Sequence, residues 1–169
     1  MKRVLAATGV VLGLGLIGYA VFSRETDEEQ IRRRLTELAD AVHLDAERGN
    51  PAVRGLELRG RFAELFEKDV RAQIPELGSS RQTRDDLAAL AAQSSAYFQS
   101  LDLDFQKVDV QLDGTRSGAR VSSVVVMTAT RRTDPAPERD EREVTFRFVK
   151  TDDPGWRIAE LVVGERPAP

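Results

Sequence analysis

The sequence predicts an α+β fold, in which three helices in the first half of the chain pack on a strongly bent antiparallel sheet. Two observations support this prediction. Apolar residues recur at helical spacing up to about Phe98, and they alternate with polar residues from Leu101 onward. The alternation then changes parity within two strands, which requires an extra residue in each and bends the sheet.

The first element is an uncharged apolar run, residues 4–22, which begins at Val4 and ends at Phe22 and follows Lys2 and Arg3. It is just long enough for a helix that crosses a bilayer. The basic residues before it predict a single-pass anchor in the cytoplasmic membrane, with the N-terminus inside and the domain outside. The run also fits a signal peptide cleaved near Ala20, which would release a secreted or periplasmic protein. We favour the anchor, because the apolar run continues past Ala20.

Three amphipathic helices are expected next. The first covers residues 26–47 and opens with a capping box at Thr26. The second covers residues 52–69. An extended piece follows over residues 70–77, because Pro75 disfavours helix at the residue before it. The third starts after Thr83, a capping residue followed by acids, and its many small residues suit close packing on the sheet.

Strands are expected from Leu101 to the end of the domain. The apolar parity changes at Gln106–Lys107, which predicts a β-bulge there. Residues 119–130 are rich in β-branched side chains and predict a long strand, whose valine run at 124–126 suggests cover on both faces. Residues 131–142 are polar and contain two prolines, so we expect a connecting loop.

The last two strands are predicted to form a hairpin over residues 144–163. Val144, Phe146 and Phe148 share one face of the first strand, and residues 152–155 carry the Pro-Gly signal of a turn. In the second strand the apolar parity changes midway, which predicts a bulge near Ala159–Glu160.

Composition excludes several kinds of site. The chain of 169 residues has a net charge of −3, no cysteine and one histidine. Thiol chemistry, disulfides and multi-histidine metal sites are therefore excluded, and a nucleic-acid partner is not expected of a mildly acidic domain. No phosphate-binding, dinucleotide-binding or serine-hydrolase motif occurs, so we expect no cofactor and identify no catalytic residue.

Residues 1–23 are thus expected to be the membrane anchor or signal peptide, residues 24–166 one domain, and residues 167–169 a tail. The domain resembles the nuclear transport factor 2-like superfamily, which includes ketosteroid isomerases and polyketide cyclases. The resemblance rests on residues 26–47, on LFEKDVRAQIPELGSSRQTRDDLAAL at 65–90 and on VTFRFVKTDDPGWRIAELVV at 144–163. It implies a cone-shaped fold whose curved sheet and helices enclose a pocket. No catalytic motif of the family matches positions in this sequence.

Aromatic side chains are the candidates for lining such a pocket, although they could equally fill it as core. They are Phe62, Phe66, Tyr97, Phe105, Phe146, Phe148 and Trp156. His43 is interpreted as a histidine at a helix end, and Asp102 and Asp104 as residues of a solvated strand face.

Three functions remain open. The first choice is a non-enzymatic binding or assembly module tethered to the outer face of the cytoplasmic membrane, with a homodimer formed through the sheet. The second is an isomerase- or cyclase-like enzyme that uses a pocket acid, Asp45 or Asp104, beside Tyr97. The third is an exported carrier of a small hydrophobic ligand. The enzyme needs an acid or His43 in the cavity, the carrier needs an open apolar cavity, and the module needs a filled interior and an exposed apolar patch.

Overall fold

The computed structural model describes residues 25–45, 51–77, 82–152 and 155–165. The expected anchor and tail lie outside these residues. Within the described part of the chain, no helix is long and apolar enough to cross a membrane. The chain divides into two compact units, residues 1–30 and 31–169.

In the first unit, the described residues form the capping box predicted at Thr26. The Thr26 hydroxyl accepts a hydrogen bond from the Glu29 N–H at 3.2 Å, and the Glu29 carboxylate accepts one from the Thr26 N–H at 2.7 Å. These bonds satisfy amide groups that a helix start leaves without partners. The helix that they begin, α2, runs over Asp27–Val42.

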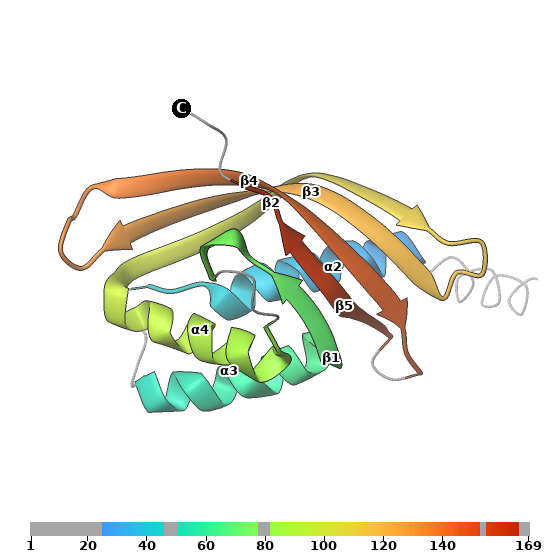
Figure 1. Cartoon of the computed structure of the whole chain (residues 1–169), viewed down its shortest axis with the longest axis horizontal. Coiled ribbons are helices and arrows are strands. Elements are labelled where there is room, and N and C mark those ends of the chain that lie inside the picture. Colours follow the sequence, from blue (N-terminus) through green and yellow to red (C-terminus); the bar gives the residue numbers. More distant parts are fainter. Residues whose placement is uncertain (1–24, 46–50, 78–81, 153–154, 166–169) are drawn as a thin grey trace, which may run out of the picture. The chain divides into compact units, whose positions relative to one another are not determined.

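The other helices are α3 (Pro51–Leu65) and α4 (Arg84–Tyr97), and all three helices lie on one side of the sheet (Figure 1). The first two helices end earlier than the sequence predicted. Beyond α2, Leu44 is already extended and forms an antiparallel bridge with Leu101. Beyond α3, the chain enters a strand at Phe66, because Phe66, Val70 and Ala72 are buried in an alternating pattern.

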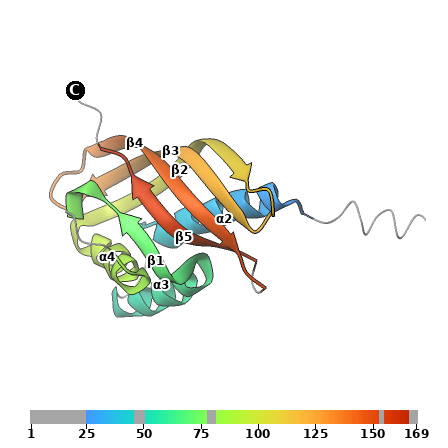
Figure 2. The same ribbon diagram turned by 45° about the vertical axis from the view of Figure 1, so that its right-hand side comes forward.

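The sheet has five strands in the order β1-β5-β4-β3-β2 (Figure 2). Their bounds are β1 Phe66–Gln73, β2 Phe98–Leu112, β3 Gly118–Arg131, β4 Pro137–Lys150 and β5 Trp156–Val163. The prediction of a purely antiparallel sheet was wrong, because β1 pairs parallel to β5 while the other pairs are antiparallel. The 3₁₀ turn η1 (Pro75–Leu77) follows β1.

Both predicted bulges are confirmed. In β2, Gln106 pairs with Val124 and Asp109 pairs with Ser122, so two residues of β2 oppose one of β3. Lys107, at this bulge, has a positive φ of 51°. In β5, Ile158 pairs with Phe148 and Glu160 with Arg147, which leaves Ala159 as the extra residue.

One other expectation was wrong. Residues 131–142 are not all loop, because β4 begins at Pro137, the first strand position, where the missing N–H of proline is tolerated. The small-residue helix α4 contacts strands β1 and β2, and it also packs against α3, where a Cβ added at Gly55 would lie 3.9 Å from the Ala92 Cβ.

The core of the second unit lies between the helices and the sheet face that they cover. Its largest fully buried side chains include Trp156, Phe146 and Phe148 from the final hairpin, which belong to one hydrophobic cluster with helical residues such as Leu35 and Leu58. On the opposite face of β3, Val126 is buried and Val124 half-buried, but Arg120, Ser122 and Thr128 are exposed, so the expected cover on both faces holds only at the valine run.

Candidate functional site

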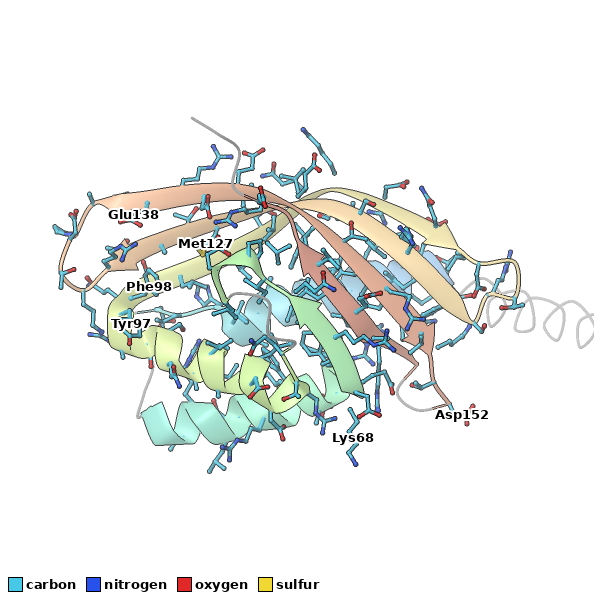
Figure 3. All side chains as sticks on the ribbon, in the orientation of Figure 1. Lys68, Tyr97, Phe98, Met127, Glu138 and Asp152 are labelled. Carbon is cyan, nitrogen blue, oxygen red and sulfur yellow. The ribbon has the colours of Figure 1, made fainter. Side chains whose placement is uncertain are left out.

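The core is not completely filled. A cavity of about 450 Å³ lies between the sheet and the helices. Every layer contributes apolar walls to it, as shown by Leu38 of α2, Phe62 of α3, Leu87 of α4, Val125 of β3, Phe146 of β4 and Leu161 of β5. Met127 also lines the cavity from β3 (Figure 3). Among the described lining residues only Glu76, Asp140 and Arg142 are charged, and we call them the charged trio.

The charged trio is joined by direct contacts around the Arg142 guanidinium. Its Nη2 lies 2.5 Å from the Glu76 carboxylate, and its Nε lies 3.0 Å from the Asp140 carboxylate. Its Nη1 donates a hydrogen bond to the Gly164 carbonyl at 3.4 Å. Asp140 and Arg142 are two apart on β4 and therefore share a face, while Glu76 comes from η1.

Burial and charge differ within the charged trio. The Arg142 side chain is only 9% exposed, against 19% for Asp140 and 52% for Glu76. The hydrogen bond to Glu76, with the nearby negative charge of Asp140, raises the pKa of Arg142 above its ordinary value. Arg142 is therefore a cation beside the two carboxylates, and the half-exposed Glu76 lies where the cavity meets solvent.

The aromatic candidates separate into three groups. Phe62, Phe66, Phe105 and Phe146 line the cavity. Phe148 and Trp156 are fully buried in the core and do not line it. Tyr97 is 67% exposed at the end of α4 (Figure 3), because the chain leaves the helix there and enters β2 at the next residue.

The titratable residues that the sequence suggested for an enzyme site, His43, Asp45 and Asp104, do not line the cavity. His43 and Asp102 form a surface pair, with Nδ1 and Oδ1 3.1 Å apart. Asp104 is exposed and accepts a hydrogen bond from the Gln106 amide at 2.7 Å. Neither Asp45 nor Asp104 lines the cavity and Tyr97 is exposed, so the hypothesis of one of these acids beside Tyr97 was wrong.

Comparison with protein families identifies the domain. The model of the SnoaL-like domain matches residues 57–162, which is more than half of the chain. The chain belongs to the SnoaL-like domain family. This places it in the nuclear transport factor 2-like superfamily, as the resemblance of its sequence implied. No curated protein matches the chain.

Solved structures share the fold of this SnoaL-like domain. A provisionally assigned scytalone dehydratase from Novosphingobium aromaticivorans has a TM-score of 0.61 and 15% identity, covering 79% of each chain. A superfamily member from Salmonella enterica has a TM-score of 0.63 and 15% identity, covering 83% of this chain and 91% of its own. The CaMKII hub of S. rosetta has a TM-score of 0.64 and 14% identity, covering 83% and 98%. At such low identity these likenesses show the fold alone.

Sequence reasoning missed the whole charged trio of the SnoaL-like domain. Asp140 and Arg142 were assigned to a loop, because two prolines and many charges precede the apolar part of β4. One signal could have identified them: both lie an even number of residues before Val144 and Phe146, so they belong to the same inward-facing side of the strand. Glu76 had no such signal, since η1 follows a strand that the sequence placed too late.

The arrangement can bind a small molecule. Within the described ranges, no group of three or more His, Cys, Asp or Glu side chains could hold a metal ion. The apolar walls can take up the body of a small molecule, and the carboxylates of the charged trio can accept hydrogen bonds or a proton from it.

Proposed function

We propose that this SnoaL-like domain binds a small, largely apolar molecule in its cavity. The observation that carries the proposal is an unfilled volume of about 450 Å³ lined by apolar side chains, with three charged groups gathered around Arg142. Binding sites for small molecules typically have roughly 300–1,000 Å³ and the same pattern of apolar walls with a few polar groups.

The state of the interior favours ligand binding over the assembly module. That module requires aromatic side chains to fill the space between sheet and helices, yet Phe62, Phe105 and Phe146 border a cavity instead. An empty cavity also lowers stability, by roughly 24 cal/mol for each Å³ in engineered cases. The assembly module also requires an exposed apolar patch. Among the described residues, the exposed large apolar side chains are Val53, Leu56 and Tyr97.

Two adjacent residues of β3 provide a matched test. Val125 lines the cavity, whereas Val124 lies on the opposite face of the sheet. We expect Val125→Trp to place a bulky ring inside the cavity and weaken the binding of 1-octanol to the full-length chain in calorimetric titrations. Val124→Trp, with the same change in volume, should leave the affinity within about twofold of the wild type. Equal binding to both variants would place octanol outside the cavity and overturn the proposal.

We also propose that residues 4–22 anchor the chain, with the domain on the outer face of the cytoplasmic membrane. The support is the length of this apolar run and the basic residues before it. The chain should remain with membranes after alkaline extraction and should keep its original N-terminus. A soluble chain that starts just after Ala20 would instead indicate an exported ligand carrier.

Association of two copies through the sheet is a separate proposal. The outer face of β4 and β5 carries the ion pairs Arg139–Glu141 at 3.4 Å and Arg147–Glu160 at 3.7 Å. One structure of similar fold is a hub, that of CaMKII. Association through such a charged face should weaken as salt rises, which sedimentation velocity at two ionic strengths can test. A monomer at low salt would contradict the proposal.

A further inference from the structure

We infer that the outer edge of β2 is a docking site for an extended peptide segment of another protein, in which an acidic residue precedes a basic one. The inference is independent of ligand binding in the cavity. It follows from unpaired backbone groups at this edge, from a groove that runs beside them, and from the charges at the two ends of that groove.

The backbone of β2 is the first argument. β2 is the last strand in the sheet order, so one of its edges faces away from β3. At that edge the Leu101 N–H donates to the Leu44 carbonyl at 2.9 Å, and the Leu101 carbonyl accepts from the Leu44 N–H at 2.8 Å. Backbone groups alternate along a strand, so the N–H and C=O groups of Leu103 and Phe105 also point away from β3.

These outward groups are open to an added strand. Among the described residues, Leu44 alone forms backbone hydrogen bonds to this edge between Leu101 and Leu112. An edge strand with unpaired donors and acceptors is a template for pairing with another chain. Extended peptides bind other domains in this way, with affinity from the backbone and specificity from alternate side chains.

A groove beside the edge is the second argument. This edge groove has a volume of about 350 Å³ and lies between α2 and β2. Leu35 and Ala39 of α2 give it an apolar floor together with Phe105 and Val108 of β2, which are only half-buried. Alternate side chains of an added strand point to one face, so apolar residues at every second position can cover this floor.

The charges of the edge groove are the third argument. Arg32 and Asp40 line it from α2, about two turns and roughly 12 Å apart. The bridge that follows α2 ties its end to the start of β2, so Asp40 and Asp104 mark one end of the groove. Arg32 and Lys107, the residue at the β2 bulge, mark the other end. All four side chains are exposed, and none forms an ion pair with a described residue.

The pairing of Leu44 also gives the direction of the bound peptide. It is antiparallel to β2, and a peptide that continues it runs from the basic end of the edge groove toward the acidic end. The first charged residue of the peptide therefore meets Arg32 and Lys107, and the second meets Asp40 and Asp104. An acidic residue should precede a basic one by about four positions, since a strand rises roughly 3.3 Å per residue.

Two peptides of identical composition test the inference: acetyl-TEVTVKT-amide and acetyl-TKVTVET-amide, each titrated calorimetrically into the full-length chain at low ionic strength. We expect the first to bind at least about threefold more tightly, because exposed ion pairs contribute little individually. This preference should shrink as sodium chloride is added. At saturation the first peptide should slow hydrogen exchange of the Leu103 and Phe105 amides at least about tenfold.

A pair of double variants assigns the preference to the edge groove. Arg32→Glu with Asp40→Lys exchanges the charges at the two ends without changing the net charge, so the preference between the peptides should reverse. The control, Arg59→Glu with Glu57→Lys, makes the same exchange at exposed positions of α3. It should keep the wild-type preference.

Three outcomes would overturn the inference. The first is equal binding of the two peptides, or tighter binding of the second. The next is binding that leaves the Leu103 and Phe105 amides unprotected. The last is protection of these amides without peptide that grows with protein concentration, because a second copy of the chain would then occupy the edge. Failure of 1-octanol to bind would overturn the proposed function and leave this inference standing.

Discussion

At the scale of single residues, Arg54 connects α3 to the end of α2 through hydrogen bonds. It is buried on α3, and it donates from Nη1 to the His43 carbonyl and from Nη2 to the Val42 carbonyl, both at 3.0 Å. These carbonyls lie at the end of α2, where a helix leaves acceptors unpaired and favours a cation.

We therefore expect Arg54→Met to lower the free energy of unfolding by about 2–3 kcal/mol, since it leaves buried acceptors without donors. Urea denaturation of the full-length chain measures this loss. Arg59→Met is the matched control, because Arg59 is exposed on the same helix. Equal losses in the two variants would show that Arg54 does not cap α2.

Thr83 lowers the pKa of the Asp86 carboxyl group. At the start of α4 its hydroxyl and its N–H donate to the Asp86 carboxylate at 2.7 and 2.9 Å, which confirms the predicted cap. These hydrogen bonds, chiefly that of the hydroxyl, hold the pKa of Asp86 below its ordinary value. The stabilisation by the ionised carboxylate is therefore present above the ordinary pKa of aspartate. It is lost as the pH falls through the lower pKa of the folded state.

The variant Thr83→Val should raise the pKa of Asp86 toward the ordinary value, because it removes the hydroxyl donor. A pH titration of the Asp86 carboxyl carbon by NMR reads this directly. If the carboxyl titrates at the same pH in both proteins, the hydroxyl does not determine its charge.

At the scale of the element, the bulge in β5 decides which way half a strand faces. Ala159 is the extra residue, and beyond it Leu161 and Val163 line the cavity. Deleting Ala159 would remove the extra residue together with the odd spacing, so Leu161 and Val163 would follow Ile158 in regular alternation and stay on the inner face. Since exposing one buried aliphatic side chain costs roughly 1.5–3 kcal/mol, we expect the deletion to cost less than this in unfolding free energy, measured by urea denaturation.

The replacement Ala159→Gly serves as control for that deletion. It keeps the extra residue and the register, so its cost should stay near or below 1 kcal/mol. A deletion variant that loses more than about 3 kcal/mol relative to this control would mean that Leu161 and Val163 had left the inner face.

The same elements show how far the sequence could predict the fold. Bulges and caps were predictable because they arise from neighbours in the chain: a change of parity at Lys107 or Ala159, and an acid three residues after Thr83. The parallel pairing of β1 with β5 was not, because it joins residues 66–73 to 156–163 and no local signal records it. Asp140 and Arg142 were wrongly assigned to a loop, because the nearby charges and prolines indicated a loop more strongly than the alternating pattern indicated a strand. The strand is evident only from the pairing of β4 with β3.

At the scale of the whole molecule, the cavity depends on the assembly of every layer. Its walls come from all three helices and from strands β1 to β5, and the charged trio joins η1 to β4. The sequence identified the aromatic candidates as large apolar residues that could line a pocket or fill the core. It could not tell which of them border a cavity and which fill the core. That distinction depends on volumes left between elements far apart in the chain.

The most direct test of ligand binding uses the methionines. The chain has two, Met1 and Met127, and Met127 lines the cavity. With ¹³C-methyl methionine, 1-octanol should shift the Met127 signal and show magnetisation transfer to its methyl group, because the bound alkyl chain lies against it. In Val125→Trp both effects should weaken, while Val124→Trp keeps them at the wild-type level. A Met127 signal that stays unchanged at octanol concentrations that saturate binding would contradict ligand binding in the cavity.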